Sequence, residues 1–255
     1  MKLRENRLML IWLFCAGMIF FGCVVAYFQG WWDIINKGDQ TKISFINFGV
    51  FLVGLAVNGR NTFRINRELK SASEFSQLCE KGCLDNEVLN TAWKNSDSSL
   101  ASAHIMNLHK IANKQKNGDV NQSVLIEIMA VELEAPETWT RHIAMTLASF
   151  GLFGTLVGFV ISMDGLDILM GMDKATSLQG LQKAIHGMGT AFYATLMAVI
   201  FGAVFLELLH RLVSNAITKL VITMAKTGEI YIIPEIKAQF MDKNSASGEI
   251  CEIPK

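Results

Sequence analysis

Two apolar stretches decide the fold of this chain: Leu147-Ala-Ser-Phe-Gly-Leu-Phe-Gly-Thr155-Leu-Val-Gly158 and Gly187-Met-Gly-Thr190-Ala-Phe-Tyr-Ala-Thr195-Leu-Met-Ala198. The first lies within residues 143–163 and the second within residues 184–206, and neither of these runs contains Asp, Glu, Lys or Arg. About 20 helical residues cross the hydrocarbon core of a bilayer, so each run is long enough to span it. An ion path in a membrane usually needs a carboxylate. The helix pair therefore looks like half of an ion path, with the charged half on another chain.

Two further uncharged runs, residues 8–28 and 43–57, raise the expected number of spans to four. The first is too long for a signal peptide and lacks a small-x-small cleavage site after it, so we expect a retained anchor. The second is short unless it borrows Asn58, Gly59 and part of 34–42. The charged fraction is 18%, against roughly 25% in soluble domains, and the mean hydropathy is +0.32. We therefore expect an all-α membrane protein with four transmembrane helices.

Lysine and arginine are distributed unevenly around these spans. They gather before the first span, after the second, before the third and after the fourth, at Lys2, Arg4, Arg7, Arg60, Arg64, Arg67, Lys70, Arg141, Arg211, Lys219 and Lys226. Such clusters mark cytoplasmic segments, so both termini are expected in the cytoplasm. Trp31, Trp32 and Trp139 flank spans, where tryptophan typically anchors a helix at the membrane interface. The net charge is zero, which gives no sign of nucleic-acid binding.

These assignments divide the chain into four parts. Transmembrane helices 1 and 2, with a short periplasmic loop, are expected in 1–58, and a helical cytoplasmic insertion in 59–141. Channel helices 3 and 4 would occupy 142–213, followed by a helical extension and flexible tail in 214–255. Pro136 is expected in the first turn of the third membrane helix, a position where proline is tolerated.

Small residues and threonines recur at helical spacing in the two deciding stretches. Residues four apart share a helix face, which gives two stripes on the third helix and one on the fourth: Gly154 and Gly158; Gly151 and Thr155; and Thr190, Ala194 and Ala198. Small residues let membrane helices approach closely, so helix packing alone accounts for the glycines. The threonine hydroxyls either bond back to carbonyls one turn earlier or line a hydrated path.

Enzyme and metal chemistry find little support in the chain. No Ser-His pair, metal-ligand cluster or pair of aspartates lies within a span. Cys79, Cys83, His104 and His109 resemble zinc-ligand spacing only loosely. Two histidines five residues apart do not share a helix face, and a structural zinc site needs four converging ligands. We expect no enzyme activity, no cofactor and no metal.

The stretch Gly151-Leu-Phe-Gly-Thr-Leu-Val-Gly158 resembles the third-helix motif G-x-x-G-T-x-x-G of the MotA/TolQ/ExbB proton-channel family. Gly189-Thr-Ala-Phe-Tyr-Ala194 is similar to the family's last-helix motif, in which small and aromatic residues follow a threonine. Four spans with an insertion between the second and third resemble the MotA-like branch. The segment that starts at Gly187 looks closest to motor subunits of Zorya-type phage-defence systems. The charged segment of flagellar stators is not found between Arg60 and Arg141.

The resemblance implies a homopentamer in the bacterial inner membrane, around a dimer of single-span partners of the MotB, ExbD or TolR kind. Each partner helix would carry a membrane aspartate. Thr155 and Thr190 would line the ion path. Five small residues would pack against the partner helix: Gly151, Gly154, Gly158, Ala194 and Ala198. Sodium-driven relatives supply a second threonine where Ala191 stands, so protons are the expected ion.

The expected function is therefore that of a membrane motor or channel subunit driven by the ion-motive force. It would conduct protons together with its partner and power mechanical work or biopolymer transport. The alternative from a different class is a membrane scaffold or signalling protein that does not conduct. The object that is moved cannot be inferred from these residues.

Overall fold

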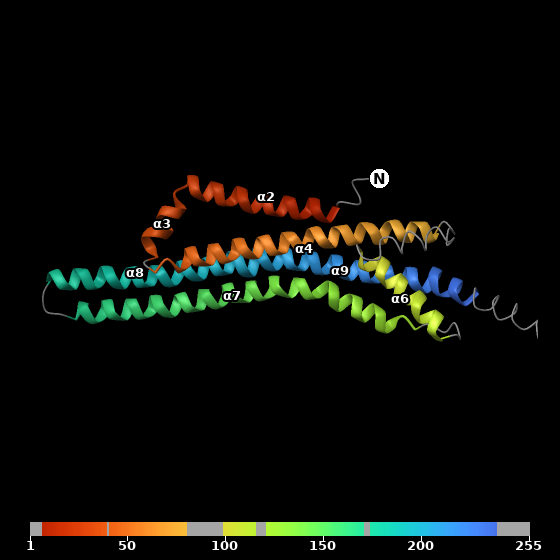
Figure 1. The fold of residues 1–255 in the computed structure, drawn as a ribbon. Coiled ribbons are helices and arrows are strands. Elements are labelled where there is room, and N and C mark those ends of the chain that lie inside the picture. Colours follow the sequence, from red (N-terminus) through yellow and green to blue (C-terminus); the bar gives the residue numbers. More distant parts are fainter. Residues whose placement is uncertain (1–6, 40, 81–98, 116–120, 171–173, 239–255) are drawn as a thin grey trace, which may run out of the picture. The chain divides into compact units, whose positions relative to one another are not determined.

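The computed structural model describes residues 7–39, 41–80, 99–115, 121–170 and 174–238 (Figure 1). Within these ranges the chain is helical and contains no strand, which confirms the all-α prediction. The elements are α2 (Arg7–Phe28), α3 (Trp31–Gly38), α4 (Ile43–Glu80), α6 (Leu100–Gln115), α7 (Ser123–Leu169), α8 (Lys174–Ala198), the π-helical η1 (Val199–Leu206), α9 (Glu207–Thr227) and the π-helical η2 (Gly228–Ile232). Most of the predicted tail, from residue 239 onward, lies outside the described residues.

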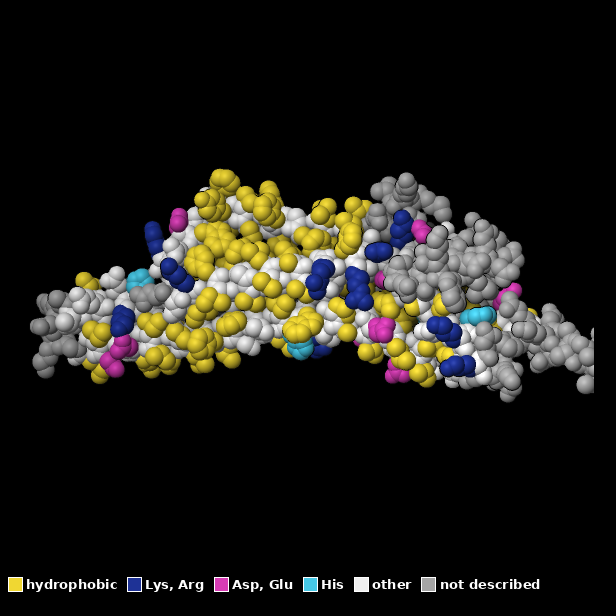
Figure 2. Space-filling view, viewed as in Figure 1, with side chains coloured by type: hydrophobic (Ala, Val, Ile, Leu, Met, Phe, Trp, Pro, Cys, Tyr) yellow, Lys and Arg dark blue, Asp and Glu magenta, His cyan; other side chains and the backbone are white. Residues whose placement is uncertain are grey.

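Four helical runs are long and apolar enough to cross a membrane, as predicted: Arg7–Phe28, Ile43–Gln77, Ser123–Leu169 and Thr176–Ala238. Many of their large apolar side chains face outward. Phe14 and Phe21 of α2 are 68% and 69% exposed, and Phe159 of α7 is 60% exposed. Figure 2 shows a broad hydrophobic patch over α2 and the adjoining part of α4. Apolar surface of this extent is expected where the surrounding solvent is lipid.

The second span is not short, because its helix continues to Glu80 without a break. The extra residues come from beyond position 57, while most of 34–42 belongs to the separate helix α3. Asp39 is buried and caps the start of α4. One of its carboxylate oxygens accepts a hydrogen bond from the Ser44 amide at 2.8 Å, and the other accepts from the Thr41 amide and hydroxyl at 3.1 and 2.9 Å. These bonds satisfy amides that the first helical turn leaves free.

The prediction that Pro136 starts the third membrane helix is wrong. Pro136 lies inside α7, which runs unbroken for 47 residues. Proline lacks an amide hydrogen and disfavours a helix interior, but packing against α4 supports the helix at this point. The Asn61 side-chain amide donates a hydrogen bond to the Pro136 carbonyl oxygen at 2.8 Å.

The chain divides into two compact units. The span unit comprises Leu8–Thr62 and Pro136–Val213 and contains all four uncharged runs. The insertion unit comprises Met1–Arg7, Phe63–Ala135 and Ser214–Lys255. In the insertion unit, Glu68 of α4 is buried and caps α6, because it accepts hydrogen bonds from the Ser99 hydroxyl and the Leu100 amide, each at 3.0 Å.

The core of the span unit is aromatic and aliphatic. Phe51 of α4 stacks on Phe201 of η1 with their ring centroids 4.6 Å apart. Leu147 of α7, Leu206 of η1 and Leu209 of α9 complete this layer and are fully buried. The layer fills the middle of the unit with side chains that carry no hydrogen-bonding group.

Candidate ion-path site

Glycines bring the backbones of α7 and α8 into direct contact. A Cβ atom added at Gly158 would lie 2.5 Å from the Gly187 carbonyl oxygen, and one at Gly187 would lie 2.4 Å from the Ser162 amide nitrogen. The pair Gly165 and Gly180 approaches in the same way near the end of the hairpin. Such distances leave no room for a side chain. The reciprocal pairs fix the register of the two helices and place Thr155 and Thr190 at about the same level.

The five small residues assigned to a partner helix meet their own chain in the structure. A Cβ at Gly151 would lie 2.4 Å from the Cβ of Ala198, and one at Gly154 would lie 2.3 Å from that of Ala194. Gly158 faces Gly187 and Ala191. The space in front of these residues is thus filled by α8 and α7 of the same chain. Their contact with a partner helix stays a prediction.

Thr155 meets Thr195 at one backbone oxygen. The Thr155 hydroxyl lies 3.1 Å from the Gly151 carbonyl oxygen and donates at 2.7 Å to that of Leu152. The Thr195 hydroxyl lies 3.5 Å from the same Gly151 oxygen and donates at 2.9 Å to the Ala191 carbonyl. Both threonines are only half-buried. Two hydroxyls from neighbouring helices therefore lie together at the surface of the α7–α8 pair.

Thr190 lies at this level but on a different face of α8. It is fully buried, and its hydroxyl is 3.4 Å from the Gly38 carbonyl oxygen at the end of α3. The approach of α3 to α8 is close, because a Cβ added at Gly38 would lie 2.2 Å from the ring of Tyr193. The structure therefore brings Thr195, and not Thr190, to Thr155. Thr195 could have been predicted only from the register of the α7–α8 hairpin, which places it opposite Gly151.

Asn47 of α4 adds a buried amide near the threonines. Its side-chain nitrogen donates to the Ala194 carbonyl oxygen at 3.3 Å. Among the described residues, its side-chain oxygen and the Ser44 hydroxyl are buried without a hydrogen-bond partner. We did not expect Asn47 from the sequence, although a polar residue inside an uncharged run is the signal that could have found it.

A second polar group, the Glu137 cluster, comprises Glu137, His210, Asn58, Asn61 and Trp12. One Glu137 carboxylate oxygen lies 3.0 Å from both the Asn58 amide nitrogen and His210 Nδ1, and the other accepts from the Asn61 amide at 3.1 Å. The Trp12 indole donates to the Asn58 side-chain oxygen at 2.8 Å. The cluster therefore ties α2, α4, α7 and α9 together around one buried carboxyl group.

The sequence does not indicate a buried Glu137, because this residue precedes the uncharged run that begins at residue 143. The available signal was Asn58 and Asn61, which stand three residues apart just after the second uncharged run. Glu137 and Thr155 are 18 positions apart in the sequence, roughly 27 Å along a helix. The Glu137 cluster is therefore separate from the threonine site.

The apolar core layer separates these two polar groups. On each of three helical runs, an apolar core residue lies between a polar residue at the threonine site and a residue of the Glu137 cluster. The three sets are Asn47, Phe51 and Asn58 on α4; Thr155, Leu147 and Glu137 on α7; and Thr195, Phe201 and His210 from α8 to α9. The apolar residue of each set is at most 5% exposed. On each of these runs, a buried apolar side chain therefore stands between the threonine site and the Glu137 cluster.

Among the described residues, no group of three His, Cys, Asp or Glu side chains is placed to hold a metal ion. Burial raises the pKa of the Cys79 thiol to about 11. That thiol is therefore protonated at neutral pH when no metal is bound. Cys83 of the loose zinc pattern lies outside the described residues.

Fold and site together define a multi-pass helical membrane protein whose two glycine-packed helices carry threonines at their surface. The chain belongs to the MotA/TolQ/ExbB proton channel family, because the model of that family matches residues 92–226, just over half of the sequence. This match covers α7, α8 and η1 and confirms the resemblance found in the two motifs. The family is one of proton channels and motor subunits rather than enzymes. Comparison with curated proteins and with solved structures gives no match.

Proposed function

We propose that this chain is a proton-conducting motor subunit that conducts only when paired with a membrane-embedded carboxylate from a second protein. Membership of a proton-channel family supports conduction. The observation that carries the need for a partner is the apolar layer of Phe51, Leu147 and Phe201, all buried. Because water and protons do not cross such a layer, the path runs along the outer surface of the chain.

The Thr155–Thr195 pair is the proposed edge of that path. A hydroxyl both donates and accepts hydrogen bonds, so two of them side by side can hold a water molecule and pass a proton to a neighbouring acid. Thr190 contributes indirectly, because its contact with the end of α3 holds α8 in position at the level of this pair. The glycines contribute by holding α7 and α8 at a fixed spacing, on which the partner helix packs.

The assembly we propose is a homopentamer around a dimer of single-span helices, each with one aspartate, in the bacterial inner membrane. Both termini of the chain would lie in the cytoplasm. The ion would be a proton, because Ala191 supplies no oxygen ligand for sodium. A charge that falls through 100 mV releases about 2.3 kcal/mol, which is enough to bias one step of a mechanical cycle.

Proton uptake into vesicles tests this proposal. The chain is co-expressed with a candidate single-span partner that carries a membrane aspartate, and uptake is followed with a pH-sensitive dye under an imposed potential. Thr155→Val and Thr195→Val remove a hydroxyl at nearly constant volume. We expect each to slow uptake by about tenfold, equivalent to roughly 1.4 kcal/mol in the barrier. Thr190→Val is expected to act in the same direction.

Thr146→Val is the matched control, because Thr146 lies on the face of α7 opposite Thr155 and is exposed. Its hydroxyl donates to the His142 carbonyl oxygen at 2.8 Å. It should leave uptake unchanged. Normal uptake in both Thr155→Val and Thr195→Val would refute the assigned path. A stable complex with the partner that takes up no protons at all would instead favour the non-conducting scaffold.

A further inference from the structure

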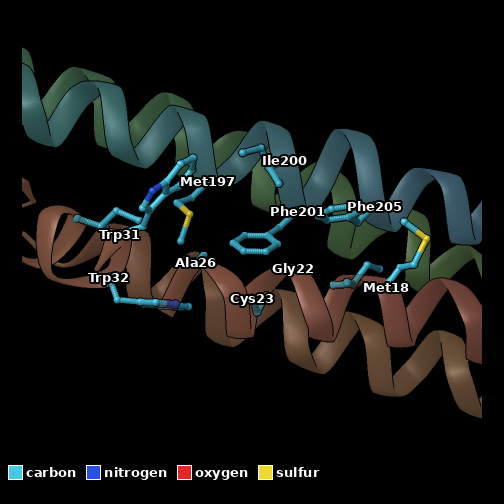
Figure 3. Close-up of a pocket in the computed structure, with 12 residues that line it drawn as sticks. Met18, Gly22, Cys23, Ala26, Trp31, Trp32, Met197, Ile200, Phe201 and Phe205 are labelled. Atoms are coloured by element: carbon cyan, nitrogen blue, oxygen red, sulfur yellow. The ribbon is translucent and has the colours of Figure 1, made fainter. Parts of the chain in front are cut away.

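A groove of about 240 Å³ lies between α2, α3 and the α8–η1 run of the span unit (Figure 3). Small residues of α2, namely Gly22, Cys23 and Ala26, form one wall. Phe201 and Ile200 of η1 stand opposite, and Trp31 and Trp32 of α3 close one end (Figure 3). Apart from the two indoles and the thiol, the lining side chains carry no polar group. The groove is therefore dry.

The α2 wall of the groove belongs to the uncharged run 8–28, which is long enough to span the lipid tails. The far side of the same helix exposes Phe14 and Phe21 to the surroundings. Trp31 and Trp32 follow the end of α2, at the level where tryptophan meets lipid headgroups. Lys37 and Lys42 come shortly after and are exposed, so cationic groups are available for a lipid phosphate at this end.

The lining of the groove favours an acyl chain as its occupant. Because the lining offers almost no hydrogen-bonding group, an aliphatic chain loses no hydrogen bond on entering it. A cavity needs roughly 10–15 Å³ of volume measured in this way to hold one water molecule, and a methylene group is about as large as a water molecule. The groove of about 240 Å³ therefore has room for a segment of a flexible chain.

We infer that this groove binds one acyl chain of a phospholipid from the leaflet at the Trp31 end of α2. The bound chain completes the packing of α2, in which Ile19 is the buried residue. The inference depends on membrane insertion alone, so it stands or falls separately from proton conduction.

Photo-crosslinking after dilution of bulk lipid tests the site. The full chain is reconstituted in vesicles of phosphatidylethanolamine and phosphatidylglycerol that contain a trace of phosphatidylcholine with a diazirine on its acyl chain. The protein is then extracted into detergent, irradiated and mapped by peptide mass spectrometry. We expect crosslinks in residues 18–26 and 197–205 and not at Phe159 of α7, which faces bulk lipid. Native mass spectrometry of the same extract counts the retained phospholipid.

Gly22→Phe fills the groove, and Gly17→Phe is the matched control on the same helix. An added Cβ has no other atom within 4 Å at either position, so both variants can keep the fold, which circular dichroism verifies. Gly22→Phe should reduce crosslinking and retained lipid roughly tenfold, and Gly17→Phe should change neither. Equal crosslinking in both variants would overturn the inference. Uniform labelling that includes Phe159, or crosslinks between two protein copies in place of lipid, would also overturn it.

Discussion

At the scale of single residues, the hydroxyls that approach the Gly151 carbonyl oxygen differ from the pair that the sequence predicts. From the family motif and from depth in the membrane, the sequence predicts that the hydroxyls of Thr155 and Thr190 line the ion path. In the structure the two hydroxyls that approach this oxygen belong to Thr155 and Thr195. Thr190 lies at a similar level, but its hydroxyl points to Gly38. The depth of a residue in the membrane can be estimated by counting along the sequence, whereas the direction in which its side chain points depends on the rotation of the helix.

Glu137 is predicted to be a structural anchor of the span unit. Glu137→Ala removes the carboxyl group that accepts hydrogen bonds from the Asn58 and Asn61 amides and lies 3.0 Å from His210 Nδ1. Leaving a buried hydrogen-bonding group without its partner destabilises a protein by about 1–3 kcal/mol. Thermal unfolding of the detergent-purified chain should show a clearly lower midpoint. Glu134→Ala, an exposed carboxylate on the same helix, should leave the midpoint almost unchanged, and equal shifts in the two variants would contradict the anchoring role.

His104 in the insertion unit predicts a loss of stability in acid. Burial lowers its pKa from the usual 6.5, and a hydrogen bond with Gln122 offsets this only in part. The unfolded segment therefore binds a proton more readily than the folded one. The stabilisation is complete above pH 6.5 and decreases as the pH falls below 6.5 towards the folded-state pKa.

Hydrogen exchange of the α6 amides, corrected for intrinsic rates, measures this effect at pH 7.5 and pH 5.5. We expect faster opening of α6 at the lower pH in the wild type and a much smaller change in His104→Gln. The neighbouring His109→Gln variant should keep the wild-type response. An α6 that is equally protected at both pH values in the wild type would exclude His104 as the cause.

At the scale of elements, the α7–α8 pair depends on glycine at the points of closest approach. In Gly158→Ala the new Cβ would lie 2.5 Å from the Ala191 amide nitrogen and the Gly187 carbonyl oxygen, and both are backbone atoms. Because backbone cannot swing aside, the helices must separate. We expect a loss of about 1–3 kcal/mol in stability, together with slower proton uptake by the complex.

Gly49→Ala on α4 is the control for that substitution. An added Cβ there meets nothing within 4 Å. The gain in helix propensity, about 0.5–1 kcal/mol, should therefore raise the unfolding midpoint slightly. If Gly158→Ala also raises the midpoint, the close contact of α7 with α8 is not a determinant of the fold.

Helix limits were the hardest element-scale feature to predict. Hydropathy indicated where lipid-facing segments lie, but it did not show that α4 and α7 continue well beyond them. Pro136 illustrates the reason. Its own chemistry favours a helix start, and only the neighbouring α4, through Asn61, reveals why α7 continues through it.

At the scale of the whole molecule, the distribution of Lys and Arg predicts the topology. Alkaline phosphatase fused after Met170 should be active, because that position would face the periplasm. The same fusion after Thr227 should be inactive and a green fluorescent protein fusion there should fluoresce. The physical reason is the retention of positively charged segments on the cytoplasmic side. The reverse pattern of reporter activity would refute the proposed orientation.

The sequence alone determined the four spans, the all-α class and the family, because each depends on local properties of a segment. Bilayer thickness sets the length of an uncharged run, and a motif is read along one helix. Tertiary structure alone decided that Thr195 joins Thr155, that Glu137 lies buried among two asparagines and a histidine, and that an apolar layer closes the interior. These facts depend on the rotation and register of helices distant in sequence, which close backbone contacts at Gly158 and Gly187 fix.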